Sequence, residues 1–412
     1  MTESTEIPAG PAEGRSMRIV VVNNFFPPRV GGSAHMSASL AEQYTAAGHE
    51  VLAVTAAYGD APAEEEHGGY RIVRLPAMKM PQLGLSIDFD MTFASVRPGN
   101  WRKLFKLLDE FKPDAIHLHG QFFDLTWMAG WYARKRKIPT LLTIHTLLIS
   151  EKKLYGAVFR MLDAMLVRPV LSLFKPHYVI LDKQGVDYCV HRYATSDENS
   201  EYFPIAVDTG QFEKPLTKDV RAENEIGDGP LIVSLGHIIP LRDRLPLVNA
   251  MPAILEKHPD VKVVVVGRVY HDEFIKRAEE LGVRDRFIVK GAVPKADVPS
   301  YYAAADLVTH DLNGGCGTAS LEAMLSGTAT IASTTLDNYP GIELRNGENI
   351  LLVPPDDPAA VAKAVIELLD DPVQRAVIAK RQSAMVRDNF GLDVVADEHL
   401  RTFEKLIANT PS

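Results

Sequence analysis

The stretch MRIVVVNNFFPPRVGGSAHMSASLAEQYTAAGHEVLAVTAA, residues 17–57, decides the fold. It begins with an apolar, β-branched run, which predicts a buried strand that ends at two prolines. Two glycines follow, and then Met36, Leu40 and Tyr44 recur every four residues, which predicts a helix. The run VLAVTAA predicts the next strand. A strand, a glycine loop, a helix and a strand in this order form a βαβ unit with parallel strands.

The same alternation continues along the chain and begins again near residue 210. Further apolar strands are expected at DAIHLHG (114–120), TLLTIHT (140–146), LIVSLG (231–236), VKVVVVG (261–267) and DLVTHDL (306–312). Such near-continuous apolar strands indicate parallel sheets that are covered on both faces. We therefore predict an α/β protein with two doubly wound, Rossmann-like domains facing each other across a cleft. Ligands of such sheets bind at the carboxyl ends of the strands.

Composition narrows the class of protein. The chain has 412 residues, of which 46% are hydrophobic and 24% charged, as in soluble globular proteins of two or three domains. Its net charge of −9 argues against nucleic acid as a partner. Residues 1–16 lack the apolar segment of a secretory signal and are expected to be a disordered tail. With two cysteines and no apolar run of the roughly 18 residues that cross a membrane, a cytoplasmic location is expected.

Two glycine loops stand between a strand and a helix. Gly31 and Gly32 follow the first strand, and Gly315 and Gly317 precede a helix that is expected to begin near Thr318. Glycine lets the backbone approach a ligand, and a helix start offers unpaired N–H groups to a phosphate. The alternative for the first loop is a tight turn without a ligand. The second loop is not a P-loop, because it lacks the lysine of that motif.

Charged side chains accompany these loops. Glu322 lies in the helix after the second loop, where it either accepts hydrogen bonds from ribose hydroxyls or only complements the helix dipole. His237 and Arg242, with Arg244 close by, follow another strand and suit a phosphate, unless they are ordinary solvated charges.

Histidines end two of the predicted strands. His117 and His119 alternate on one strand and so face the same side, and His145 ends the next. No cysteine or carboxylate stands at metal-ligand spacing beside them, so no metal site is expected. His145 is the best functional candidate of the three.

These motifs occur in a familiar order. From about residue 17 to residue 400 the chain resembles the family 4 retaining glycosyltransferases of the GT-B fold, on the stretches FPPRVGG, DAIHLHG, TIHT, SLGHIIPLRD, GTASLEAMLSGTATIAS and NILLVPPDDPAAVAKAVIELLDDP. The resemblance implies an acceptor-side domain over 17–209, a nucleotide-sugar domain over 210–392, and a last helix (393–412) that packs back on the first domain.

The resemblance also implies roles for single residues. Gly31 and Gly32 match the loop that faces the donor diphosphate, and Glu322 matches the acid that holds the ribose. Arg242 matches a lysine that binds phosphate, and His237 matches an arginine that also binds phosphate. His145 matches the histidine near the transferred sugar, and His119 is placed on the acceptor side.

One position departs from the family pattern. An acid that contacts the transferred sugar usually stands eight residues before Glu322, where this chain has Gly314. Asp311 or Asn313 is the candidate to replace it. Gly315, Gly317 and Thr318 are expected to bind the donor together with Asn313.

The function that follows is retaining, metal-independent transfer of a hexosyl or related group from a UDP or GDP sugar, with no cofactor. A soluble small-molecule acceptor, a sugar-nucleotide epimerase and an inactive sugar-nucleotide-binding protein are the alternatives.

The acceptor is expected to be membrane-borne. Residues 101–175 contain 13 Lys or Arg against 6 Asp or Glu. Within them, Leu154, Val158, Met161, Leu162 and Met165 recur at helical spacing beside Lys152, Lys153, Arg160 and Arg168. A basic amphipathic helix can lie on an anionic membrane, which would place the protein peripherally at the inner face. The alternative is a core-facing helix with solvated flanks.

Overall fold

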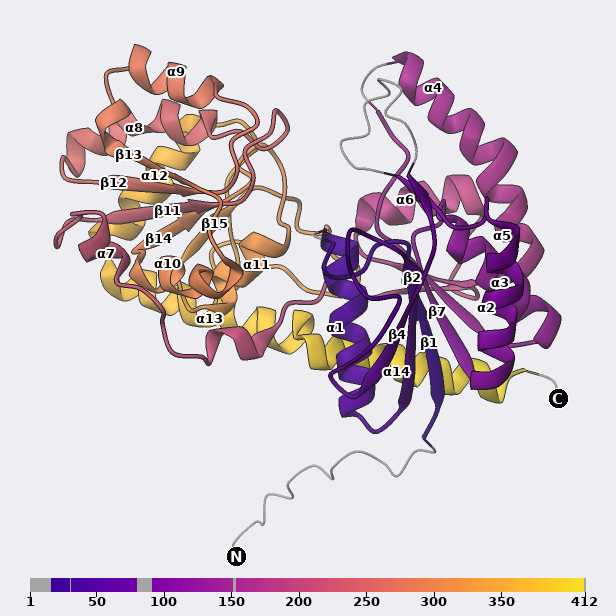
Figure 1. Cartoon of the computed structure of the whole chain (residues 1–412). Coiled ribbons are helices and arrows are strands. Elements are labelled where there is room, and N and C mark those ends of the chain that lie inside the picture. The colour runs from indigo at the N-terminus through magenta and orange to yellow at the C-terminus, as the bar shows by residue number, and fades with distance from the viewer. Residues whose placement is uncertain (1–15, 30, 80–90, 151–152, 411–412) are drawn as a thin grey trace, which may run out of the picture. The chain divides into compact units, whose positions relative to one another are not determined.

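The computed structural model describes residues 16–29, 31–79, 91–150 and 153–410 (Figure 1). They form two compact units, which are described in turn. Unit 1 comprises Met1–Ile180, Asp187–Glu201 and Ala396–Ser412, and unit 2 comprises Leu181–Val186 and Tyr202–Val395. Apart from Ser16, the predicted tail over 1–16 lies outside the described residues.

Unit 1 is built around a mainly parallel sheet. Its strands are β1 (Arg18–Val22), β2 (Glu50–Ala56), β3 (Glu64–His67), β4 (Tyr70–Leu75), β7 (Ala115–His119), β8 (Thr140–Ile144), β9 (His177–Ile180) and β10 (Ser200–Tyr202). Over the described residues their order is β10-β9-β8-β7-β1-β2-β4-β3. The buried strand β1 pairs in parallel with β2 and β7, and β3 is antiparallel to β4. A small ribbon joins β5 (Met78–Lys79) to β6 (Thr92–Phe93).

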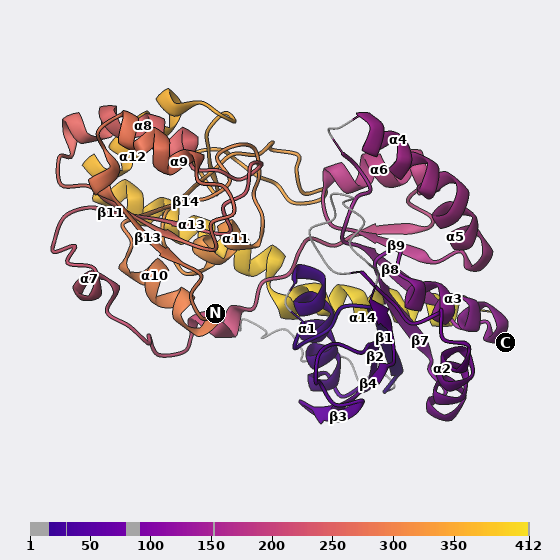
Figure 2. The same ribbon diagram turned by 45° about the horizontal axis from the view of Figure 1, so that its top comes forward.

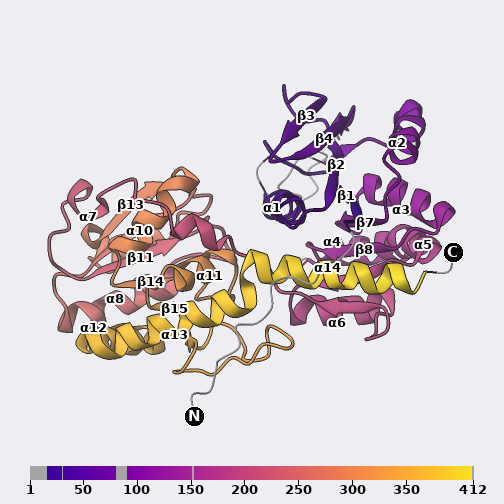
Figure 3. The same ribbon diagram turned by 90° about the horizontal axis from the view of Figure 1, so that it is seen from below.

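Helices cover both faces of this sheet (Figure 2). They are α1 (Gly32–Ala46), α2 (Pro98–Phe111), α3 (Asp124–Arg136), α4 (Lys153–Leu162), α5 (Arg168–Phe174), most of α6 (Lys183–Tyr193) and most of α14 (Leu392–Ala408). The helix predicted from Met36, Leu40 and Tyr44 is α1, and all three side chains are buried. Helix α14 lies along unit 1 (Figure 3), where Phe403 meets the ring of Tyr44 edge-on at 6.1 Å.

Unit 2 contains a second, parallel sheet. Its strands are β11 (Leu231–Leu235), β12 (Lys262–Val266), β13 (Phe287–Gly291), β14 (Leu307–Thr309), β15 (Thr330–Ala332) and β16 (Leu351–Leu352), in the order β13-β12-β11-β14-β15-β16 over the described residues. The helices are α7 (Val220–Glu223), α8 (Leu245–Lys257), α9 (Glu273–Glu280), α10 (Val298–Ala304), α11 (Thr318–Leu325), α12 (Pro358–Asp370) and α13 (Pro372–Phe390).

Strand β12, between β13 and β11, shows why unit 2 is doubly wound. Val263 and Val265 pack into one apolar cluster with α8 and α12, whereas Val264 and Val266 pack into another with α10. Successive side chains of a strand point to opposite faces, so an all-apolar strand needs cover on both. The prediction of two doubly wound parallel-sheet domains is confirmed.

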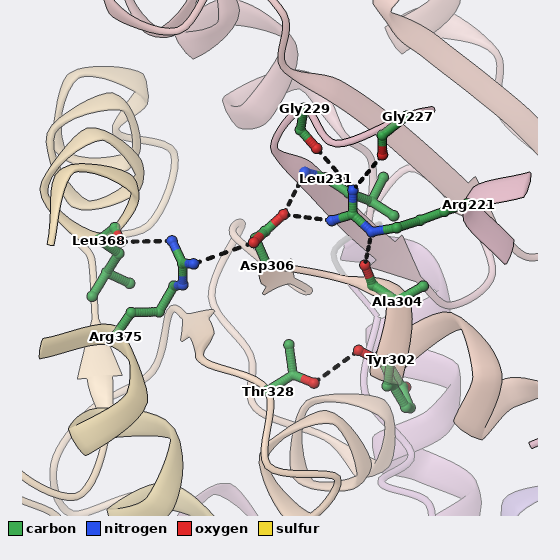
Figure 4. Close-up of polar contacts among 10 residues, drawn as sticks. All are labelled: Arg221, Gly227, Gly229, Leu231, Tyr302, Ala304, Asp306, Thr328, Leu368 and Arg375. Carbon is green, nitrogen blue, oxygen red and sulfur yellow. Dashed lines mark hydrogen bonds and ion pairs between the residues drawn. The ribbon is translucent and has the colours of Figure 1, made fainter. Parts of the chain in front are cut away.

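One carboxylate ties the amino ends of the unit 2 strands together (Figure 4). Asp306, just before β14, accepts hydrogen bonds from the backbone N–H of Leu231 at 2.9 Å and from Arg221 at 2.7 Å. Its other oxygen accepts one from Arg375 of α13 at 3.2 Å. This brace lies at the end of the sheet opposite the predicted ligand loops.

Candidate active site

The predicted residues of unit 2 lie at the carboxyl ends of β11 and β14. Arg242 is in the loop after β11, and Nε of its guanidinium lies 3.5 Å from Oδ2 of Asp311, which follows β14. The Arg242 side chain is 55% exposed. Its two terminal nitrogens have no partner among the described residues. A guanidinium held by Nε, with both NH₂ groups open, can bind an anion through two hydrogen bonds.

Arg244 supports this loop from beneath. It is buried and donates to the carbonyl oxygens of Arg242 at 2.9 Å and Gly236 at 3.1 Å. Burial lowers the pKa of Arg244 to about 10, which leaves it a cation at neutral pH.

From the sequence, Asp311 is expected only as a contact to the transferred sugar. It is buried between Arg242 and His310, whose Nδ1 lies 3.4 Å from Oδ2 of Asp311. Burial raises the pKa of Asp311, while Arg242 and Arg244 act in the opposite direction. His310 is also buried, and burial holds its pKa well below 6.5. His310 was not predicted from the sequence, and neither was Asp243 in the loop after β11. Both residues stand in strand-end loops that no motif marks.

Asn313 and Gly314 complete the turn between β14 and α11. The Asn313 amide donates to Asp356 at 2.7 Å and to Asp243 at 3.2 Å, so its NH₂ group is already engaged. Gly314 has a φ of 112°, which side-chain-bearing residues rarely adopt. In this backbone conformation an acid at position 314 would be strained.

Helix α11 presents its N-terminus beside these residues. Gly317 is the N-cap residue, no side chain caps the helix, and its first turn, which begins at Thr318, contains no acid. A Cβ built on Gly317 would meet no atom within 4 Å, whereas one on Gly315 would lie 3.1 Å from Asp311. The N–H groups at this end are therefore open to an anion.

Glu322 lies on α11 in a mostly buried setting. Burial raises the pKa of its carboxyl group, and a hydrogen bond with Gln211 acts in the opposite direction. It stands beyond the first turn of the helix, so a dipole role is weak there. No motif marks Gln211, which is distant from Glu322 along the chain.

His237 has a different setting from Arg242. Its Nδ1 accepts a hydrogen bond from the backbone N–H of Arg268 at 3.2 Å, and Tyr270 meets its ring edge-on. An Nδ1 that accepts a hydrogen bond carries no proton, so Nε2 is the nitrogen of His237 that can donate to a ligand.

In unit 1, the loop of Gly31 and Gly32 is held on both sides. The buried Arg74 donates to the carbonyl oxygen of Pro27 at 2.8 Å, and Asn23 donates to that of Ser33 at 3.1 Å. Gly31 caps α1 without any side-chain cap or acid in the first turn. A Cβ on either glycine would meet nothing within 4 Å, so the space before α1 is open.

The histidines of unit 1 form a buried cluster. Rings of His117 and His119 lie 4.1 Å apart, and His399 of α14 lies 5.0 Å from His117. Nδ1 of His119 is 2.8 Å from Nε2 of the partly exposed His145. The structure thus places the predicted residues His119 and His145 in contact. His399, which no motif marked, belongs to the same cluster. Over the described residues no group of three potential ligands could hold a metal ion.

Both halves of the chain match known protein families. Residues 31–175 match the model described as "Glycosyl transferase 4-like domain", and residues 217–385 match "Glycosyl transferases group 1". The chain is therefore similar to group 1 glycosyltransferases over its second region and to the 4-like domain of such enzymes over its first. The predicted family and enzyme class are confirmed.

Individual proteins support this family. A phosphatidyl-myo-inositol mannosyltransferase of Mycolicibacterium smegmatis is 29% identical over 402 residues, covering 94% of each chain. An alpha-monoglucosyldiacylglycerol synthase of Streptococcus pneumoniae is 26% identical and covers 77% of this chain and 71% of its own. The fold is similar to that of Anabaena HepE, whose structure was solved in complex with UDP, with a TM-score of 0.70. The alignment covers 94% of this chain and 100% of HepE, at 18% sequence identity.

Proposed function

We propose that this glycosyltransferase moves a sugar from a nucleoside diphosphate sugar of UDP or GDP type to a lipid acceptor in a membrane, with retention and without a metal or cofactor. The donor class is supported by the UDP in the HepE structure and by the open cationic groups of unit 2. The acceptor class is supported by the two relatives named for phosphatidyl-inositol and diacylglycerol products.

The diphosphate would be held by Arg242 and by the N-termini of helices. Asp311 fixes Nε of Arg242 and leaves both NH₂ groups for the phosphates. This contact, and the burial of Asp311, favour a positioning role for Asp311 over a direct contact with the sugar. Nε2–H of His237 adds a neutral donor. Glu322 would accept the ribose hydroxyls, because a partly desolvated carboxylate gains from hydrogen bonds that replace water.

The reaction requires stabilisation of the negative charge that develops on the departing diphosphate. The bond between the sugar C1 and the diphosphate oxygen breaks, and the acceptor oxygen forms its bond to C1 on the same face. The acceptor proton passes to the departing phosphate oxygen, so no separate protein base is required. One well-placed donor to developing charge contributes about 3 kcal/mol.

The single observation that carries the lipid acceptor is an exposed apolar face on α4–α5, defined by Leu154, Met161, Leu162, Met165, Leu166 and Leu173. Leu154 is 73% exposed and Met165 is 75% exposed. The exposure of these side chains supports the membrane interpretation, although Val158 of the same predicted stripe is half-buried.

The opposite side of this helical segment explains its orientation. Asp163, in the π-helical turn η1 (Asp163–Val167) between α4 and α5, is buried and accepts hydrogen bonds from Tyr188 and Tyr193, both at 2.7 Å. The polar anchor faces the unit, and the leucines and methionines face out. The described basic residues Lys153, Arg160 and Arg168 are exposed beside them, while Lys152 lies outside the described residues. An apolar face with basic flanks suits an anionic membrane surface. The described helices include none that is long and apolar enough to cross a membrane.

The test is product analysis. The full chain is incubated with UDP-glucose or GDP-mannose and vesicles containing phosphatidylinositol or diacylglycerol, with and without EDTA. The lipid products are identified by mass spectrometry, and their anomeric configuration is read by NMR. A glycosylated lipid with the α-anomeric configuration of the donor, formed equally in EDTA, supports the proposal. Transfer only to a soluble polyol or sugar, a sugar-nucleotide epimer without transfer, or donor binding without any product would each replace it by the corresponding alternative.

A further inference from the structure

Two imidazoles meet where β7 and β8 end. His119 Nδ1 and His145 Nε2 are 2.8 Å apart, and the two ring planes lie within 19° of each other. With ring centroids 5.1 Å apart, the rings are edge to edge and nearly coplanar. This is the geometry of an N–H···N hydrogen bond, which requires a proton on one of these nitrogens and a bare lone pair on the other.

The surroundings of His119 decide which nitrogen carries the proton. Its Nε2 is buried and has no hydrogen-bond partner among the described residues. A proton on Nε2 would be a buried, unpaired N–H donor, which folded proteins rarely contain. The proton of His119 therefore belongs on Nδ1, from which it donates to His145. Both rings are neutral at neutral pH, because burial lowers the pKa of His119 well below 6.5 and that of His145 to about 4.

The tautomer of His145 follows from that of its neighbour. A neutral imidazole whose Nε2 accepts a hydrogen bond carries its own proton on Nδ1. Nδ1 of His145 has no protein partner in the described part of the chain, and the side chain is partly exposed.

We propose that His119 is a positioning residue that fixes the proton of His145 on Nδ1, so that His145 acts on the substrate as a hydrogen-bond donor and not as a proton acceptor. The proposal rests on the proposed function in one respect, the contact of His145 with substrate. A donor at this place can bind a sugar oxygen or developing negative charge, and it leaves the acceptor proton to the diphosphate.

The first experiment needs no activity. Long-range ¹H–¹⁵N NMR is recorded at neutral pH on the full chain labelled with ¹⁵N-histidine, and the His145 signals are assigned by their loss in His145→Gln. We expect a protonated Nδ1 and a bare Nε2. A protonated Nε2 on His145 would overturn the proposal, whether or not the proposed transfer reaction is observed.

The second experiment separates positioning from packing. In His119→Asn the side-chain NH₂ can take the place of the Nδ1–H donor, whereas His119→Leu has no donor. We expect kcat to fall about tenfold or more in His119→Leu with little change in the donor KM, and to recover most of that loss in His119→Asn. Circular dichroism checks that both variants are folded. Unchanged kcat in folded His119→Leu, or an Nδ1–H tautomer of His145 that persists in it, would refute the positioning role.

Discussion

At the scale of single residues, the donor site rests on side chains with distinct tasks. Glu322 is mostly buried, and burial raises the pKa of its carboxyl group. If it accepts two ribose hydroxyls, Glu322→Gln weakens nucleoside diphosphate binding by about 1.5–3 kcal/mol for each lost charge-assisted bond. Isothermal calorimetry with UDP and GDP measures this, and an unchanged affinity in a folded variant would leave only a structural role for Glu322.

Arg242 and His237 differ in charge and therefore in expected effect. Arg242→Ala removes a permanent cation, and we expect kcat to fall by about a hundredfold. His237→Ala removes a neutral donor and is expected to cost less. Steady-state kinetics of both variants measures this, and a loss in His237→Ala as large as that in Arg242→Ala would contradict the expected order.

From the sequence, single residues could be predicted where a motif marks the position. The glycine loops and Glu322 stand out by spacing beside predicted strands, and the structure places the loops at strand ends as expected. Gln211 and Asp243 carry no such mark, because the residues near them, Glu322 and Asn313, are distant in sequence, and no motif marks His310 in its strand-end loop. The protonation of His237 also could not be predicted, since it depends on a backbone N–H of a neighbouring strand end.

At the scale of elements, strand and helix types were readable because the apolar periodicity is strong. The buried faces of α1 and β12 follow directly from the spacing of their apolar residues. The segment α4–η1–α5 was ambiguous for a physical reason: the same stripe can face a core or a membrane. The hydrogen bonds that Tyr188 and Tyr193 donate to the buried Asp163 show which side of the helical segment faces the unit.

This orientation makes a prediction for α4–α5. Leu154→Asp combined with Met165→Asp places two charges on the exposed apolar face, so co-sedimentation with anionic vesicles should fall strongly at low salt. The matched control is Val373→Asp on α13, which changes a side chain that is 76% exposed outside this face. Binding of wild type should weaken as salt rises, because each basic residue near an anionic surface contributes about 1 kcal/mol that salt screens. Equal losses in control and double variant, or no wild-type binding, would favour a soluble acceptor.

At the scale of the whole molecule, the buried groups with shifted pKa values differ between the two units. In unit 1, burial holds the pKa of His117 and of His119 well below 6.5. In unit 2, His310 behaves in the same way, but burial raises the pKa of Asp311 and of Glu322. The units should therefore respond differently to acid.

We expect unit 1 to lose stability first as the pH falls from about 7 to about 5. Folded His117 and His119 stay neutral in this range, whereas unfolding frees them to take up protons below pH 6.5. Each fully linked histidine thus lowers the free energy of unfolding by about 1.4 kcal/mol per pH unit. The raised pKa values of Asp311 and Glu322 have the opposite sign, since their folded forms bind protons more readily, and they offset the contribution of His310.

The chain offers a probe that separates the units. All 3 tryptophans, Trp101, Trp127 and Trp131, lie in unit 1, so their fluorescence reports its unfolding, while circular dichroism reports both units. In urea titrations the fluorescence midpoint should fall with pH, and His119→Asn, which removes one titrating ring, should make that fall shallower. A fluorescence midpoint independent of pH, or one with the same pH dependence in His119→Asn, would contradict the assignment of acid sensitivity to the histidine cluster. The comparison with the variant is decisive, because carboxylates that form ion pairs in the folded state would also weaken unit 1 in acid but would respond equally in wild type and variant.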